Sequence, residues 1–159
     1  MAIKVEKMEV VGINVHDIDK AQALFERLFG VTFLSTELGT DSPVQHLPVL
    51  TGELYEDRRF GARKPTRLAI DTNGWFELME SHQDPSQDGM RNMHLKVADM
   101  DEAIAELQRL GLRLVGNVQV GSMREAIFEA DDMFNARVCL VWYEGDSLIE
   151  ALLTEPPEG

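Results

Sequence analysis

The chain has 159 residues, and its composition (44% hydrophobic, 27% charged) is typical of a globular protein large enough to bury a core. Its net charge of −13 argues against nucleic acid and anionic membrane surfaces as partners, because both carry negative charge themselves. No apolar run approaches the roughly 20 residues of a membrane span, no signal peptide begins the chain, and the single cysteine, Cys139, excludes an internal disulfide, which predicts a cytoplasmic protein.

The chain begins with a predicted strand and an amphipathic helix. Residues 7–15 (KMEVVGINV) alternate as a strand does, with Val11, Ile13 and Val15 on one face. Residues 18–29 then place apolar side chains at helical spacing, and Asp17 is suited to cap the N-terminus of that helix. Three further strands are predicted at 31–38, 66–71 and 74–80.

The second half of the chain repeats this order. A shift of 82 residues places VGINVHDIDKA on MHLKVADMDEA, and it matches Asp17 with Asp99. Residues 92–97 are a predicted strand, and Asp99 is suited to cap a helix over 100–110. The remaining predicted strands are 113–120, 125–130 and 136–144, so each half has the order β-α-β-β-β.

The repeat predicts one compact domain built from two units. The first unit covers 1–81, a polar linker covers 82–89, the second unit covers 90–154, and 155–159 form a tail. Residues 39–64 lack a clear period and contain Pro43, Pro48 and Gly52, which predicts a long loop able to lie over a site.

A duplicated β-α-β-β-β unit, headed by VGINVHDIDKA in one copy and HLKVADMDEA in the other, resembles the vicinal oxygen chelate superfamily. That superfamily includes glyoxalase I, bleomycin-resistance proteins, methylmalonyl-CoA epimerase and extradiol dioxygenases. The resemblance covers about residues 6–144. It implies an α+β fold in which the two units form a curved sheet around a cavity, the glyoxalase/bleomycin-resistance fold.

Metal-dependent members of that superfamily typically place one ligand at the head of the first strand and a glutamate in the last strand of each unit. The resemblance puts these positions at Val10, Glu77, Asn92 and Cys139, of which only Glu77 is a standard family ligand. His94 lies two residues beyond the second head position, about 6.6 Å along the strand, which is too far to complete the same coordination sphere. We therefore expect no cofactor and no bound metal.

Strand alternation gives a list of side chains facing the cavity. Glu77, His94 and Lys96 are the candidate catalytic residues, because a buried carboxylate beside an imidazole or an ammonium is suited to proton transfer. The candidate substrate-binding residues are Asn14, Trp75, Asn92, Arg137 and Cys139. Each also has a purely structural explanation: His94 as a hydrogen-bonded strand histidine, Cys139 as a small buried hydrophobe, and Lys96 as a side chain that reaches solvent.

Two functions are compatible with this list. The first, which we favour, is a metal-free isomerase, epimerase or lyase that acts on a small organic molecule with Glu77 as general base. The alternative is a non-catalytic protein of the bleomycin-resistance type that binds and sequesters a drug or antibiotic. In either case the partner is a small molecule, and the sheet edges of the two units predict a homodimer.

Overall fold

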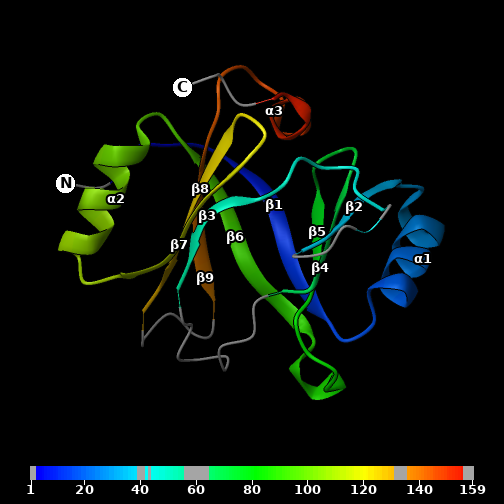
Figure 1. The fold of residues 1–159 in the computed structure, drawn as a ribbon. Coiled ribbons are helices and arrows are strands. Elements are labelled where there is room, and N and C mark those ends of the chain that lie inside the picture. Colours follow the sequence, from blue (N-terminus) through cyan, green and yellow to red (C-terminus); the bar gives the residue numbers. More distant parts are fainter. Residues whose placement is uncertain (1–2, 39–41, 43, 56–64, 131–135, 156–159) are drawn as a thin grey trace.

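The computed structural model describes residues 3–38, 42, 44–55, 65–130 and 136–155 (Figure 1). The first half of the chain forms β1 (Val5–Val15), α1 (Ile18–Phe29), β2 (Phe33–Glu37), β3 (Thr51–Leu54), β4 (Arg67–Asp71) and β5 (Phe76–Glu80). After the short 3-10 helix η1 (Pro85–Gln87), the second half forms β6 (Gly89–Val97), α2 (Met100–Arg109), β7 (Arg113–Val120), β8 (Met123–Glu129), β9 (Arg137–Trp142) and α3 (Leu148–Leu153). None of the helices in these ranges is long and apolar enough to cross a membrane.

The described strands form one curled sheet in the order β2-β4-β5-β1-β6-β9-β8-β7-β3 (Figure 1). The first half contributes β2-β4-β5-β1, the second half contributes β6-β9-β8-β7, and these sets meet where β1 pairs antiparallel with β6. The strand β3 of the first half crosses over and pairs with β7 of the second half. Within each half the first and last strands are parallel neighbours, β1 with β5 and β6 with β9. The predicted α+β fold, with two β-α-β-β-β units in a curved sheet, is confirmed, and a single chain completes the sheet.

The predicted helix caps are also confirmed. The Asp17 carboxylate accepts the Lys20 backbone N–H at 3.0 Å, and Gly30 takes the left-handed conformation (φ 65°) after α1. Asp99 accepts the Glu102 backbone N–H at 2.9 Å at the start of α2. A carboxylate at each N-terminus satisfies a free N–H of the first turn and complements the helix dipole.

The two faces of the sheet carry different cores. On the outer face α1 packs on Ile13, Val15 and Leu78, and α2 packs on the corresponding side chains of β8 and β9. On the inner face, defined here as the face that carries Val10, α3 packs on Val120, Met123, Val141 and Tyr143. The predicted alternation of β1 is therefore confirmed, because Val10 lies on the face opposite Ile13 and Val15.

Two elements differ from the prediction. Within the predicted loop 39–64, residues 51–54 form β3 and pair antiparallel with β7, while Leu47 is buried in the inner core. Residues 39–41, 43 and 56–64 of that loop, and 156–159 of the predicted tail, lie outside the described residues. The helix α3 was not predicted, because six residues are too few to show helical spacing; it is held by Ser147 as N-cap and by burial of Leu148, Ala151 and Leu152.

Gly12 lies at the joint between the two halves, opposite Glu77 of β5 on one side and Asn92 of β6 on the other. A Cβ atom at this position would lie 2.6 Å from the Asn92 Cβ, which is closer than two carbon atoms can approach. We therefore expect Gly12→Ala to lower the free energy of unfolding by about 1–3 kcal/mol, the usual cost of overpacking a core. Urea denaturation measures this, and the exposed change Thr72→Ala is the control, expected within about 0.5 kcal/mol of wild type. Equal midpoints for Gly12→Ala and wild type would contradict the close approach.

Candidate functional site

A turn stabilised by one carboxylate sets the start of the strand that carries Glu77. Asp71, fully buried at the end of β4, accepts the backbone N–H groups of Asn73, Trp75 and Phe76 at 2.8, 2.8 and 2.6 Å. Gly74 supplies the left-handed residue of the turn (φ 72°). The turn aligns β5 parallel to β1, and the register places Glu77 beside Gly12, where there is no side chain to exclude it.

Two carboxylates surround the imidazole of His94 on the inner face. Its Nε2 lies 3.1 Å from Glu125 Oε1 and 3.4 Å from Glu77 Oε2, and its Nδ1 lies 3.1 Å from the Val10 carbonyl oxygen. Since every one of these neighbours is an acceptor, the geometry favours an imidazolium that donates from both nitrogens. The side chains of Glu77 and Glu125 are only 18% and 12% exposed, so this charged group is largely withdrawn from water.

Burial and charge change the acidity of each member of this group. Burial raises the pKa of Glu77 to about 7, with Glu125 adding to the rise while His94 and Arg137 oppose it. Burial alone would lower the pKa of His94, but the Cys139 sulfur and the Glu77 and Glu125 carboxylates together raise it well above 6.5. Burial also opposes ionisation of Glu125, yet the hydrogen bond with His94 keeps the pKa of that carboxyl below its usual 4.5. Near neutral pH, Glu77 is thus the member that changes protonation state.

Cys139 lies against the same imidazole. It is fully buried in β9, directly opposite His94 of β6 in the register, and burial raises the pKa of its thiol to about 12. Arg137, two residues earlier on the same strand, supplies a positive charge that favours ionisation of both Glu77 and Glu125. Glu77, His94, Arg137 and Cys139 are therefore four predicted site residues that the fold brings together.

The predicted amides lie at the edge of this group. Asn92 is buried against Gly12; its Nδ2 lies 3.5 Å from the Met79 sulfur, and its Oδ1 has no hydrogen-bond partner among the described residues. Asn14, oriented by its hydrogen-bond network, accepts from Arg91 Nη1 at 2.8 Å and Nε at 3.0 Å. Roles of these amides in binding a substrate stay predictions.

Lys96 and Trp75 lie apart from the carboxylates. Lys96 Nζ donates to the Gly145 carbonyl at 2.7 Å, pairs with Glu6 at 3.5 Å and lies 4.3 Å from the centre of the Tyr143 ring. His94, and not Lys96, is therefore the cation in contact with Glu77. Trp75 lies in the turn before β5 and is 54% exposed, and its predicted stacking role stays a prediction.

Sequence reasoning missed Glu125 and Arg91. The alternation of β8 could have found Glu125, because Ala126 and Phe128 pack against α2 and leave Glu125 on the opposite face. Arg91 gave no such signal, since the β1–β6 register shifts between Gly12 and Ile13, next to where Arg91 lies. A β-bulge of this kind interrupts the alternation from which the face of a side chain is predicted.

The superfamily's metal positions do not fit a metal in this chain. Val10 offers only its backbone carbonyl, which faces His94, and Asn92 offers a neutral amide whose Nδ2 lies against Met79. That leaves Glu77 and Cys139 at the family positions, fewer than the three protein ligands of a catalytic zinc site.

Comparison with solved structures shows that the chain shares its fold with methylmalonyl-CoA epimerases. The chain is similar to methylmalonyl-CoA epimerase from Mycobacterium tuberculosis, with a TM-score of 0.59 and 18% identity over 91% of this chain and 92% of that one. It is also similar to methylmalonyl-CoA epimerase in complex with methylmalonyl-CoA and ammonium (TM-score 0.55, 16% identity, 89% and 97% covered). A Streptomyces coelicolor epimerase variant bound to 2-nitronate-propionyl-CoA gives a TM-score of 0.55 at 17% identity, with 89% and 97% covered. No protein-family model and no curated protein sequence matches the chain.

The raised pKa of Glu77 makes a prediction about stability. In the unfolded chain this carboxyl loses its proton near pH 4.5, whereas in the folded chain it keeps it to about 7, so its ionisation destabilises the fold as pH rises between these values. We expect Glu77→Gln in chelator-containing buffer to gain stability relative to wild type as pH rises from 4.5 to 8, by about 1–3 kcal/mol in total. Urea denaturation at each pH measures the difference, and the same change at exposed Glu144 is the control. A pH-independent difference would contradict the assignment.

Proposed function

We propose that this protein is a small-molecule isomerase or epimerase that removes and returns a proton at a carbon next to a carbonyl group, with Glu77 as the proton-transferring residue. The observation that carries the proposal is the placement of the Glu77 carboxylate, largely buried, 3.4 Å from the His94 imidazole. Similarity to methylmalonyl-CoA epimerases, at 15–18% identity, supports the reaction class.

The proposed reaction needs a base and a positive environment for the negative charge that forms. The Glu77 carboxylate accepts the proton of the carbon acid, and the electrons of the broken C–H bond move onto the neighbouring carbonyl oxygen as an enolate. Arg137 and the His94 imidazolium supply positive charge on the same face of the sheet, which favours the enolate in a site poor in water. The Glu77 carboxylic acid then returns the proton to the carbon, and the configuration inverts when the planar enolate has first turned its opposite face toward Glu77.

The carboxylate also suits this task because its surroundings tune its acidity. A general base is most effective when its pKa lies near the working pH, and burial brings the pKa of Glu77 to about 7. Asn92 contributes a buried amide next to Glu77 across Gly12, and we assign to it the contact with the carbonyl or carboxylate of the substrate. A lyase that begins with the same proton removal would use the same groups.

Proton exchange tests this function without a full assay for product. We expect the protein to exchange the α-proton of methylmalonyl-CoA, used as the probe, for deuterium in heavy water, observed by NMR. Glu77→Gln should slow exchange by at least about 100-fold, because glutamine keeps the shape and loses the base. Glu144→Gln, the same change at an exposed position, should exchange at the wild-type rate.

The same experiment separates the enzyme from the alternative in which the protein only binds its ligand. Binding of the probe by wild type without any exchange would overturn the proposed proton transfer on this substrate class. Exchange that is unchanged in Glu77→Gln would overturn the role of Glu77 as base.

We also propose a homodimer formed through the outer face of the central strands. Phe76, Val11 and Met93 lie side by side across β5, β1 and β6, and Phe29 of α1 stacks near Phe76 with ring centres 5.2 Å apart. Met93 is 41% exposed and Phe29 is 51% exposed, so this apolar patch faces solvent in the isolated chain. Contiguous apolar surface of this kind is typical of an interface.

Sedimentation velocity at micromolar concentration tests the dimer. We expect wild type to sediment as a dimer and Met93→Glu to raise the dissociation constant at least about tenfold, since an unpaired carboxylate in an apolar interface costs more than the roughly 1.4 kcal/mol of one decade. Leu153→Glu, a similar change at an exposed position on α3, should leave the dimer intact. A monomeric wild type would contradict the proposal.

A further inference from the structure

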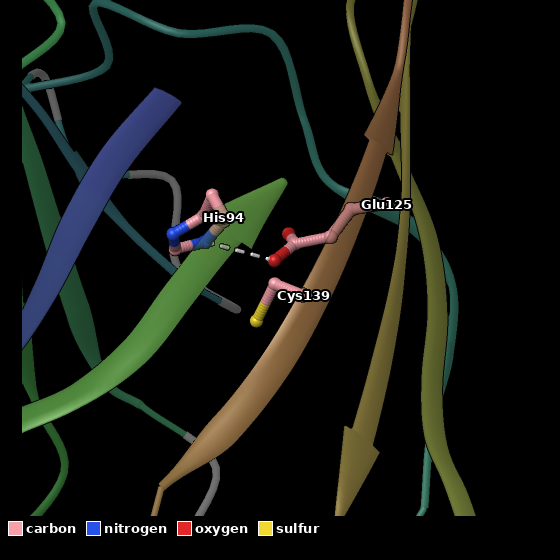
Figure 2. Close-up of side chains that lie close together, drawn as sticks. All are labelled: His94, Glu125 and Cys139. Atoms are coloured by element: carbon pink, nitrogen blue, oxygen red, sulfur yellow. Dashed lines mark hydrogen bonds and ion pairs between the residues drawn. The ribbon is translucent and has the colours of Figure 1, made fainter. Parts of the chain in front are cut away.

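Two of the side chains around His94 have no part in the proposed proton transfer. Glu125 and Cys139 both contact His94 from the side away from β1, since β9 and β8 follow β6 in the sheet. Figure 2 shows the imidazole of His94, the carboxylate of Glu125 and the thiol of Cys139 pointing toward one another from three adjacent strands. Their buried and convergent arrangement needs an explanation beyond the packing of a core.

The donor atoms of these three side chains are close enough to share one ion. One atom from each of His94, Glu125 and Cys139 lies within 4.8 Å of the other two, and His94 Nε2 is 3.1 Å from Glu125 Oε1. A tetrahedral zinc ion with bonds of about 2.0–2.3 Å holds its ligand atoms about 3.3–3.8 Å apart. The widest pair therefore has to approach by only about 1 Å, which is within the reach of side-chain rotation on fixed strands.

The donor atoms of these three side chains favour some metal ions over others. An imidazole, a carboxylate and a thiolate together suit zinc and similar transition metals, whereas calcium and magnesium prefer oxygen ligands alone. Three protein ligands from three strands leave one position of a tetrahedron open, as in catalytic zinc sites. Glu77 Oε2 lies 3.4 Å from His94 Nε2, is buried and has no hydrogen-bond partner among the described residues, so it adjoins that position.

We propose that His94, Glu125 and Cys139 form a zinc site with an open position beside Glu77. Only Cys139 belongs to the superfamily's metal positions; the other two ligands come from two residues further along β6 and from β8. The site is therefore displaced from the family position toward the second unit. It rests on this three-strand geometry and not on the proposed proton transfer. A bound ion would replace the proton of the His94 imidazolium and would supply the positive charge beside Glu77 in its place.

This proposal replaces the expectation of a metal-free protein. That expectation set His94 aside because it lies about 6.6 Å along the strand from the family head position at Asn92, whereas its imidazole lies 3.4 Å from Glu77 and 3.1 Å from Glu125. It also omitted Glu125, which supplies the carboxylate that the family glutamate position at Cys139 lacks. With His94 and Glu125 added to Cys139, the number of protein ligands reaches three.

Cobalt substitution tests the site on the full chain without any substrate. After dialysis against chelator, titration with Co²⁺ should produce a saturable near-ultraviolet absorption band from thiolate-to-cobalt charge transfer, with one ion per chain. Equilibrium dialysis with Zn²⁺ should also give one ion per chain, and zinc should displace the cobalt band. Cys139→Ser, a change of nearly the same size, should abolish the band, while far-UV circular dichroism checks the fold.

The variants decide between this site and adventitious binding. His94→Gln, Glu125→Gln and Cys139→Ser should each weaken Zn²⁺ binding by more than about 100-fold, since losing even an outer-shell partner costs about 10–100-fold. His16→Gln is the matched control, because His16 also lies beside a carboxylate, 2.7 Å from Asp88, but in another part of the molecule.

No saturable zinc binding by wild type, or equal affinity in folded Cys139→Ser and wild type, would overturn the zinc site. So would a loss of binding in His16→Gln alone. Zinc binding without deuterium exchange would support the site and overturn only the proposed reaction; exchange without zinc binding would do the reverse.

Discussion

The pairing of β1 with β6 is the constraint on which the rest of the molecule depends. It joins two separate sets of strands into one sheet, and it does so at Gly12, whose missing side chain allows Asn92 to approach. Gly12 also pairs with Glu77 of β5 on its other side. One glycine therefore brings a carboxylate of the first half beside the imidazole of the second half, although Glu77 and His94 are carried by strands that do not pair with each other.

Burying the charged side chains around His94 destabilises the fold, and the same burial gives Glu77 a reactive acidity. Burying carboxylates is unfavourable unless charge and hydrogen bonds compensate, and here one imidazolium lies between two of them. Compensation is complete for Glu125, whose pKa falls, and incomplete for Glu77, whose pKa rises to about 7. A carboxyl group left undercompensated is one that binds a proton reversibly near neutral pH, so stability and reactivity are set by the same contacts.

Much of the fold could be predicted from the sequence, because its signals are local. The repeat at a shift of 82 residues, the caps Asp17 and Asp99, and the alternation of β1 each depend on neighbouring residues. The elements that could not be predicted depend on partners far along the chain. β3 forms only because it lies beside β7, and α3 forms because the inner face offers an apolar surface.

The candidate site was predictable in part for the same reason. Alternation identified His94 and Glu77 as members of one face, but spacing along a strand says nothing about where two side chains from different strands meet. The rise of about 6.6 Å between Asn92 and His94 along one strand therefore carries no information about the 3.4 Å contact between His94 and Glu77 across the sheet. Lys96, chosen by the same alternation, instead lies beside Gly145 and Tyr143, because the residues that follow β9 pass that end of β6.

The duplication also explains why the chemistry is asymmetric. The shift of 82 matches Val10, Gly12 and Asn14 of the first copy with Asn92, His94 and Lys96 of the second, so the position of the imidazole in one copy is a glycine in the other. Gly12 pairs with Asn92, and a Cβ at position 12 would lie 2.6 Å from the Asn92 Cβ, so the joint excludes a larger residue in the first copy. A small residue in the first copy permits the strands to approach, and the second copy then supplies the imidazole at the centre. The glycine of the first copy is thus a packing requirement of the joint, while the imidazole at the matching position of the second copy lies between Glu77 and Glu125.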